Sequence, residues 1–243
     1  MQEIKPYSHL TDSKKKQVKN MFDTIAPAYD ILNSVLSLGI DQRWRKKAIS
    51  KIDKSTDPIQ ILDVATGTGD MAILAAKTFP NAMITGIDLS EGMLKVGVER
   101  IEKLKLQNQI QLQYGDCEEL DFSNEKFDVA MASFGIRNFE NLDAGLSNMY
   151  RVLKPGGKII ILEFSKPKSF PFKQIFHFYF KYILPLIGRL GSKDQKAYKY
   201  LYESVQQFPD YERFIAKLTQ TGFTNCKFQS LSLGICCLYE GQK

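Results

Sequence analysis

Four polar side chains stand at the ends of apolar, β-branched runs: Asp63, Asp88, Asp116 and Ser133. Runs of this kind, bounded by glycine, proline or polar residues, are typical of buried parallel strands. The carboxyl ends of parallel strands meet at one edge of an open sheet, where the ligands of such sheets bind. Any one of these side chains could instead be a solvated strand-end residue. Three acids in successive loops nevertheless predict a shared site for a cationic ligand.

A glycine-rich turn follows the first of these strands, Pro58–Val64. Gly67 and Gly69 add no Cβ, so a ligand can approach the backbone closely. Asp70 opens a helix whose first N–H groups face the turn. The spacing Gly67-x-Gly69-x-x-Ala72 also fits a dinucleotide-binding fingerprint, with Asp88 placed 19 residues after Gly69 as the ribose-binding acid.

Asp63 separates the two interpretations, because a carboxylate at the strand end would repel a pyrophosphate. The same carboxylate suits a ligand with an ammonium and a sulfonium, such as S-adenosylmethionine. We therefore predict that Asp63 faces the ammonium, directly or through water, and that Thr68 lines the methionine side. The alternative for Asp63 is a buried, hydrogen-bonded carboxylate with no ligand.

The remaining strand ends match the other parts of this ligand. Asp88 can accept hydrogen bonds from both ribose hydroxyls, and Asp116 with the backbone N–H of Cys117 can bind the amino edge of adenine. Ser133 can meet the methionine end of the cofactor or the substrate. The predicted cofactor-binding residues are Asp63, Gly67, Thr68, Gly69, Asp88, Asp116, Cys117 and Ser133.

The elements that must position these residues alternate regularly after Pro58, which predicts an α/β fold in one domain. We expect a helical N-terminal lid over 1–57 and a cofactor-binding core over 58–165, followed by a basic, aromatic helical insertion over 166–209 and a closing helix and strands over 210–243. Asp41 is predicted to cap one lid helix, after Gly39 ends another. The predicted strands are 58–64, 82–88, 110–116, 127–133, 158–163, 223–229 and 233–239, the last two an antiparallel pair, and predicted helices include 14–24, 141–153 and 210–221.

Composition narrows the class of protein. The four cysteines show neither zinc spacing nor a redox pair, so we expect reduced thiols, a cytoplasmic location and no metal. The first twenty residues are polar and rich in lysine, and no uncharged apolar run reaches about 18 residues, so we expect neither a signal peptide nor a transmembrane helix.

The motifs together resemble a class I S-adenosylmethionine-dependent methyltransferase. Two stretches are similar to signatures of the quinone C-methyltransferases, which act on demethylmenaquinol and on 2-methoxy-6-polyprenyl-1,4-benzoquinol. The first is Tyr29-Asp30-x-Leu32-Asn33-x-x-Leu36-Ser37 with Trp44, and the second runs from Arg151 to Ser165. The loop Ser133–Asn138 and the stretches 200–204 and 208–209 resemble the same family. Ala65 stands where many methyltransferases have glycine, which this family tolerates. Leu32 stands where the family usually has methionine, and Asp41 stands where it usually has histidine.

The resemblance implies a Rossmann-like domain with a seven-stranded, mostly parallel sheet and a C-terminal antiparallel strand. It implies methyl transfer from S-adenosylmethionine to a ring carbon of a polyprenylated quinol, most simply demethylmenaquinol in menaquinone biosynthesis, with S-adenosylhomocysteine as product. Its cofactor contacts carry over onto Thr68, Asp88, Asp116, Cys117 and Ser133.

The predicted catalytic residues are Arg137, Asn138 and Tyr29. Arg137 could stabilise the developing quinol oxyanion, directly or through water, with Asn138 orienting it. Tyr29 and Asp30 could approach from the lid. The alternative for Arg137 is a salt bridge that fixes its loop. The general base is not identified by the sequence.

The insertion carries eight basic residues and one acid between Lys166 and Lys199, a net +7 in a chain of net +6. Its apolar stretch Phe170–Ile187 suits a polyprenyl tail, and the charge suits an anionic membrane surface. A solvated face, a core helix or a dimer-forming helix would explain the same residues. The sequence shows no aromatic RNA-binding signature, so nucleic acid is not favoured as a partner. The substrate could instead be the benzoquinol, another small molecule or RNA. Two alternative functions stay open, a cofactor sensor and an NAD-dependent oxidoreductase, and the chain could form a homo-oligomer.

Overall fold

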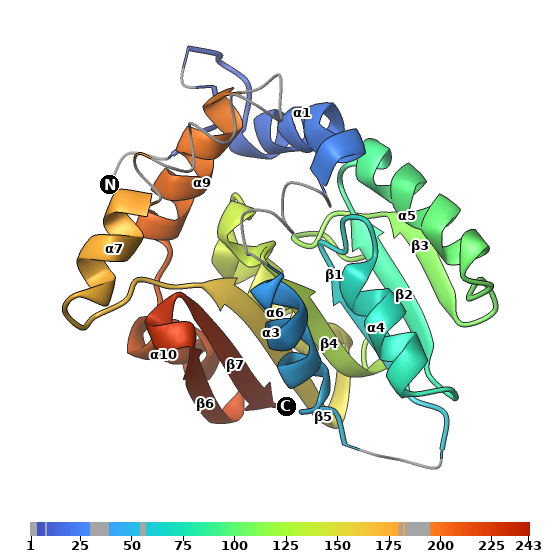
Figure 1. The fold of residues 1–243 in the computed structure, drawn as a ribbon. Coiled ribbons are helices and arrows are strands. Elements are labelled where there is room, and N and C mark those ends of the chain that lie inside the picture. The colour runs from blue at the N-terminus through green and yellow to red at the C-terminus, as the bar shows by residue number, and fades with distance from the viewer. Residues whose placement is uncertain (1–3, 8, 30–38, 54–56, 180–181, 183–194) are drawn as a thin grey trace.

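Seven strands form a single twisted sheet in the computed structural model, which describes residues 4–7, 9–29, 39–53, 57–179, 182 and 195–243. The order across the sheet is β3-β2-β1-β4-β5-β7-β6 (Figure 1). Strand β7 is antiparallel to both β5 and β6, and the other neighbours are parallel. The predicted α/β fold is confirmed. The strands are β1 (Gln60–Val64), β2 (Met83–Asp88), β3 (Ile110–Tyr114), β4 (Phe127–Ser133), β5 (Leu153–Phe164), β6 (Thr224–Leu231) and β7 (Cys236–Gln242).

Helices cover both faces of the sheet. Side chains of α3 (Ile40–Ile49), α4 (Asp70–Thr78) and α5 (Glu91–Lys103) join the core on one face. Those of α6 (Leu142–Val152) and α10 (Glu212–Thr221) join the core on the other. Helix α1 (Lys14–Ile25) lies across the carboxyl ends of the strands and beside α9 (Gln195–Gln207) (Figure 1). Helix α7 (Phe172–Phe178) lies beside α9 and farther from α1. Single 3₁₀ turns span Ala26–Ala28, Ile136–Asn138 and Ser232–Gly234.

The alternation of side chains along the central strands decides which helices each functional residue meets. Leu62 and Val64 of β1 pack in the core with α6 and α10, whereas Ile61 packs in the core with α3 and α4. Successive side chains of a strand point to opposite faces. Asp63 therefore shares the α3 face with Ile61, and Ser133 of β4 shares that face with Met131.

Helix ends follow the capping residues in most places. Ser90 caps α5 by accepting a hydrogen bond from the N–H of Met93, and Gly222 ends α10 with φ of 114°. The prediction for Asp41 is wrong. Gly39, in the left-handed region at φ 71°, is the N-cap of α3, and Asp41 lies buried in the first turn of that helix. The helix predicted before Gly39 falls on residues 30–38, outside the described ones.

Some strand limits also differ from the prediction. Strand β5 begins at Leu153 rather than Lys158, because Leu153 pairs with Phe127 across an irregularity in the ladder. Strand β6 ends later than predicted and β7 begins later than predicted, because a 3₁₀ turn with Leu233 at φ 58° separates them. The fourfold division of the domain stays a prediction. Within the described parts of the chain, every helix is too short or too polar to traverse a bilayer.

Candidate functional site

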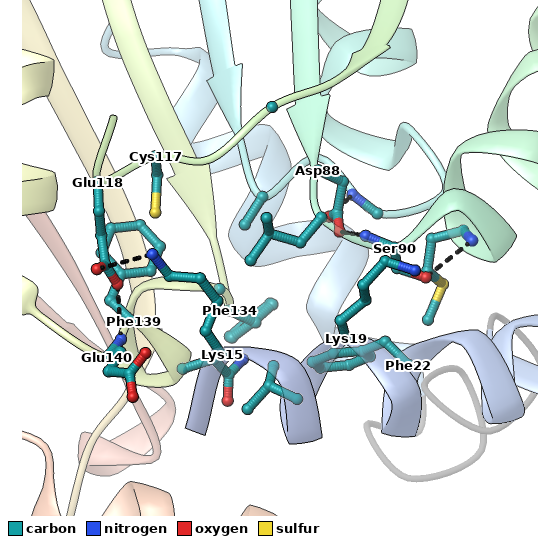
Figure 2. Close-up of a pocket in the computed structure, with 18 of the residues that line it drawn as sticks. Lys15, Lys19, Phe22, Asp88, Ser90, Cys117, Glu118, Phe134, Phe139 and Glu140 are labelled. Carbon is teal, nitrogen blue, oxygen red and sulfur yellow. Dashed lines mark hydrogen bonds and ion pairs between the residues drawn. The ribbon is translucent and has the colours of Figure 1, made fainter. Parts of the chain in front are cut away.

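A pocket of about 710 Å³, counting space open to solvent, lies between α1 and the carboxyl ends of the strands (Figure 2). Of the predicted cofactor-binding residues, Gly67, Asp88, Cys117 and Ser133 line it. The other lining residues are Lys15, Val18, Lys19, Phe22, Tyr29, Ala65, Leu89, Ser90, Met93, Gly115, Glu118, Phe134, Gly135, Asn138, Phe139 and Glu140.

Asp88 stands at the end of β2 and is held by backbone donors. Its Oδ2 accepts from the N–H of Gly67 at 2.8 Å, and its Oδ1 accepts from the N–H of Ser90 at 2.9 Å (Figure 2). Burial raises the pKa of Asp88, against these hydrogen bonds, which favour the charged form. A backbone hydrogen bond from Leu89 is the third, so the carboxylate keeps a further lone pair for a ribose hydroxyl. At Gly67, φ is 57° and a Cβ would meet no atom within 4 Å, so a ligand can lie against the backbone.

Helix α1 also contributes a residue, Lys15, to the side of the pocket where adenine is predicted to bind. Cys117 is buried and lines the pocket, and burial raises the pKa of its thiol. Asp116 lies beside the pocket, where its Oδ1 accepts from the N–H of Glu118 and its Oδ2 pairs with Lys15 Nζ at 2.5 Å. Lys15 also pairs with Glu118 Oε2 at 3.2 Å (Figure 2). The lysine run at 14–16 shows no signal that singles out Lys15, so sequence reasoning missed it.

Asp116, Cys117 and Glu118 also form a possible metal-ligand set, since their ligand atoms lie within 4.8 Å of one another. Lys15 pairs with both carboxylates and offsets part of their charge, which disfavours a cation there. The expectation of no metal stays a prediction.

Asp63, Thr68 and Gly69 lie behind the pocket rather than in its lining. Asp63 is fully buried, and its Oδ2 accepts from the hydroxyl of Thr66 at 2.6 Å. Burial raises the pKa of Asp63 to about 7, although the Thr66 hydrogen bond and the charge of Arg45 both lower it. The Thr68 hydroxyl accepts from Arg100, and Gly69, at φ 81°, is the N-cap of α4. These residues shape the turn that Gly67 presents.

Arg45 of α3 is a site residue that the sequence interpretation missed. It is buried, and its Nη1 donates to the Ser133 hydroxyl at 2.7 Å. The available signal is the helical spacing of Asp41, Trp44, Arg45 and Ala48, which places two ionic side chains on the buried face of α3.

The three predicted catalytic residues are not all placed alike. Tyr29 and Asn138 line the pocket, and no described residue bonds the buried Oδ1 of Asn138. Arg137 lies outside the lining. Its Nη1 pairs with buried Glu163 Oε1 at 2.8 Å and donates to the carbonyl of Phe134, and its backbone N–H donates to Glu163 Oε2. This is the geometry of the loop-fixing alternative, and a role in catalysis stays a prediction. Asp30 falls outside the described residues.

Comparison with known proteins agrees with this arrangement. The model of the ubiE/COQ5 methyltransferase family matches residues 10–243. A protein of Bacteroides fragilis named demethylmenaquinone methyltransferase is 49% identical over 243 residues, covering 100% of this chain and 98% of that protein. A protein of Geotalea daltonii named ubiquinone/menaquinone biosynthesis C-methyltransferase UbiE is 47% identical over 231 residues, covering 95% and 97%.

Solved structures share the fold at low identity. A Thermotoga maritima protein described as a SAM-dependent methyltransferase gives a TM-score of 0.65 at 17% identity, covering 92% of this chain and 99% of its own. Phosphoethanolamine N-methyltransferase 2 of Haemonchus contortus, in complex with S-adenosylmethionine, gives a TM-score of 0.62 at 19% sequence identity. This match covers 83% of the present chain and 52% of that chain. The open backbone at Gly67 and the oriented Asp88 carboxylate fit that cofactor. The chain belongs to the ubiE/COQ5 methyltransferase family, and it is an S-adenosylmethionine-dependent C-methyltransferase.

Proposed function

We propose that this enzyme methylates a ring carbon of a polyprenylated quinol, with demethylmenaquinol as the substrate. The name of the Bacteroides fragilis relative, 49% identical over the whole chain, supports this acceptor. The Geotalea daltonii relative carries a name that also covers ubiquinone synthesis, which makes the benzoquinol precursor the second candidate.

The observation that carries the proposal is that the pocket combines polar and aromatic residues. Asp88, Ser90 and Gly67 supply polar groups at the end of β2. Four aromatic rings also line it, and they come from α1, the turn after it, and the loop after β4: Phe22, Tyr29, Phe134 and Phe139. A flat aromatic acceptor gains both apolar burial and ring–ring contact against such rings. Substrate and cofactor can thus share one pocket, which converts methyl transfer into a reaction between oriented neighbours.

S-adenosylmethionine, when bound, supplies a methyl group already activated by its sulfonium. The residues of the chain must then orient a ring carbon and manage a quinol proton. The buried Oδ1 of Asn138 can accept a hydrogen bond from a quinol hydroxyl, which raises the electron density of the ring. Arg137 and Glu163 hold the loop that carries Phe134 and Asn138.

The insertion supports a further part of the proposal, contact with the cytoplasmic face of a membrane. Phe172, Ile175, Phe178 and Tyr182 recur at helical spacing, and all four are exposed. Phe170, just before them, is 81% exposed. Exposed apolar side chains beside lysines such as Lys173 are typical of helices that lie at an anionic membrane surface. A quinol with a prenyl tail is dissolved in that membrane.

Methyl transfer to defined acceptors tests the proposal. Radiolabelled S-adenosylmethionine is incubated in detergent with the enzyme and one acceptor at a time: demethylmenaquinone, reduced or oxidised, or the reduced benzoquinol precursor. We expect label in the reduced naphthoquinol, none in the oxidised form, and at least a tenfold loss of turnover for Asn138→Ala. Label only in the benzoquinol precursor would assign the second candidate, and label in neither quinol would overturn the proposed function.

A further inference from the structure

The order of strand ends sets the direction in which the cofactor lies. Asp116 and Cys117 follow β3, Asp88 ends β2, and Ser133 ends β4 on the other side of β1. If the ribose lies on Asp88 and adenine beside Cys117, the amino-acid part of the cofactor must extend past β1 toward Ser133. That part carries an ammonium and a carboxylate, so it needs a group of each sign.

Arg45 determines how the Ser133 hydroxyl can hydrogen-bond. Its Nη1 donates to Ser133 Oγ at 2.7 Å, so the hydroxyl is an acceptor in that contact. A serine hydroxyl has one proton to donate, and no described residue takes that of Ser133. Because Ser133 lines the pocket, its proton is available to an acceptor bound there.

The guanidinium itself lies among two carboxylates and an aromatic ring on the buried face of α3. Its Nη2 lies 3.4 Å from Asp70 Oδ2, its Nε lies 3.5 Å from Asp41 Oδ2, and its Cζ stands 5.3 Å from the centre of the Phe134 ring. Only 5% of Arg45 is exposed, so its charge is poorly screened by water. Its positive charge also lowers the pKa of Asp63, which lies behind the same pocket.

We propose that Arg45 is a positioning residue for the cofactor: through Ser133 it presents a hydroxyl proton and a positive charge to the carboxylate of the methionine part. Asp63 supplies the opposite charge for the ammonium, so Arg45 and Asp63, which are both buried, together complement the zwitterion. This inference concerns the cofactor and does not depend on which quinol is methylated.

Binding of two ligands by calorimetry tests this proposal. S-adenosylhomocysteine has the amino-acid part, whereas 5′-methylthioadenosine lacks it and keeps the adenosine. We expect Arg45→Met to weaken S-adenosylhomocysteine binding by roughly 10–100-fold, the effect of losing one hydrogen bond to a charged group, and to change methylthioadenosine binding less than about twofold. Ser133→Ala should give the same pattern, and the double variant should be no weaker than the weaker single variant. Arg45→Lys should recover part of the loss.

Arg43→Met is the matched control, because Arg43 is an exposed arginine on the same helix, and it should bind both ligands as the wild type does. Equal losses for the two ligands in the Arg45 variants would show that Arg45 only supports packing and would overturn the proposal. Should Arg45→Met fail to fold, Ser133→Ala and Arg45→Lys test the proposal by the ratio of S-adenosylhomocysteine affinity to methylthioadenosine affinity. A ratio equal to that of the wild type in both variants would overturn the proposal.

Discussion

Asp63 is a carboxyl group that folding makes harder to ionise. Burial raises its pKa to about 7, from a value near 3.8 in an unfolded chain. Between these values the folded state binds a proton that the unfolded state does not, so the contribution of Asp63 to stability is present below about pH 4 and lost as the pH rises through 7.

The free energy of unfolding of the wild type should therefore fall between pH 4 and 7, by on the order of 4 kcal/mol in total, because of Asp63. We expect Asp63→Asn to lack this fall. Chemical denaturation at several pH values measures it, with exposed Asp53→Asn as the control. If the two variants show the same pH slope, Asp63 does not titrate in this range. An ammonium beside Asp63 would favour its ionised form, so S-adenosylhomocysteine should bind the wild type more tightly as pH rises from 6 to 8.

Arg137 and Glu163 form a buried ion pair beside the pocket. Removing one partner of such a pair leaves the other charge buried without compensation, so Arg137→Ala should cost about 3–5 kcal/mol of unfolding free energy. The control is Lys217→Ala, whose partner Asp143 is exposed, and it should cost less than about 1 kcal/mol.

Urea denaturation of both variants checks this difference, and similar losses would contradict the structural role of Arg137. Turnover measured where Arg137→Ala is still folded then separates stability from chemistry. If cofactor binding and turnover both stay within a few-fold of wild type, Arg137 has no catalytic role.

Helix α1 closes the pocket by contacts at both of its ends. Lys15 pairs with Asp116 and Glu118 near the start of the helix. Toward its other end, Asp23 accepts from the Ser90 hydroxyl at 2.6 Å and from the N–H of Gly92 at 2.9 Å. The helix is therefore attached to the loops after β2 and β3 through polar contacts that can open without unfolding the core.

Lys15→Met should loosen this attachment, because it also leaves two acids close together. We expect faster hydrogen exchange of the amides of residues 14–25 and faster dissociation of S-adenosylhomocysteine, by about threefold or more for each. Lys16→Met is the control, since the side chain of Lys16 is 62% exposed and pairs with Asp12. Equal exchange rates in the two variants would show that the Lys15 contacts do not hold α1.

The strands were predictable where the hydrophobic pattern of the sequence alone determines them. The runs before Asp63, Asp88 and Ser133 are apolar and short, and each forms a parallel strand. The site was only partly predictable, because four of the eight predicted cofactor residues line the pocket and the others support it. Lys15 and Arg45 come from helices far away in sequence, and periodicity says which face is buried but not which distant partner it meets. The position of Asp41 was mistaken because a left-handed glycine caps α3 without a side chain.

At the scale of the whole molecule, α7 stands beside α9, which packs against the helix α1 that covers the pocket (Figure 1). The side chains of Phe172, Ile175 and Phe178 on α7 are exposed. A membrane bound there would bring a lipid-soluble substrate to the pocket. We expect replacement of Phe172, Ile175 and Phe178 by serine to weaken binding to phosphatidylglycerol vesicles by about tenfold or more. The unfolding free energy should change little, because all three side chains are exposed.

Vesicle sedimentation measures this binding, and added salt should weaken it in the wild type because the lysines of the insertion contribute. The control variant is Met83→Ser, an exposed apolar residue at the opposite ends of the strands. Equal binding of the two variants would exclude this face as the membrane contact.

A crystal structure with S-adenosylhomocysteine tests the central claim most directly, since every assignment depends on where the cofactor lies. The account predicts the ribose on Asp88, adenine beside Cys117 and the amino-acid part near Ser133. A cofactor bound away from these strand ends, or lying in the reverse direction along them, would contradict it.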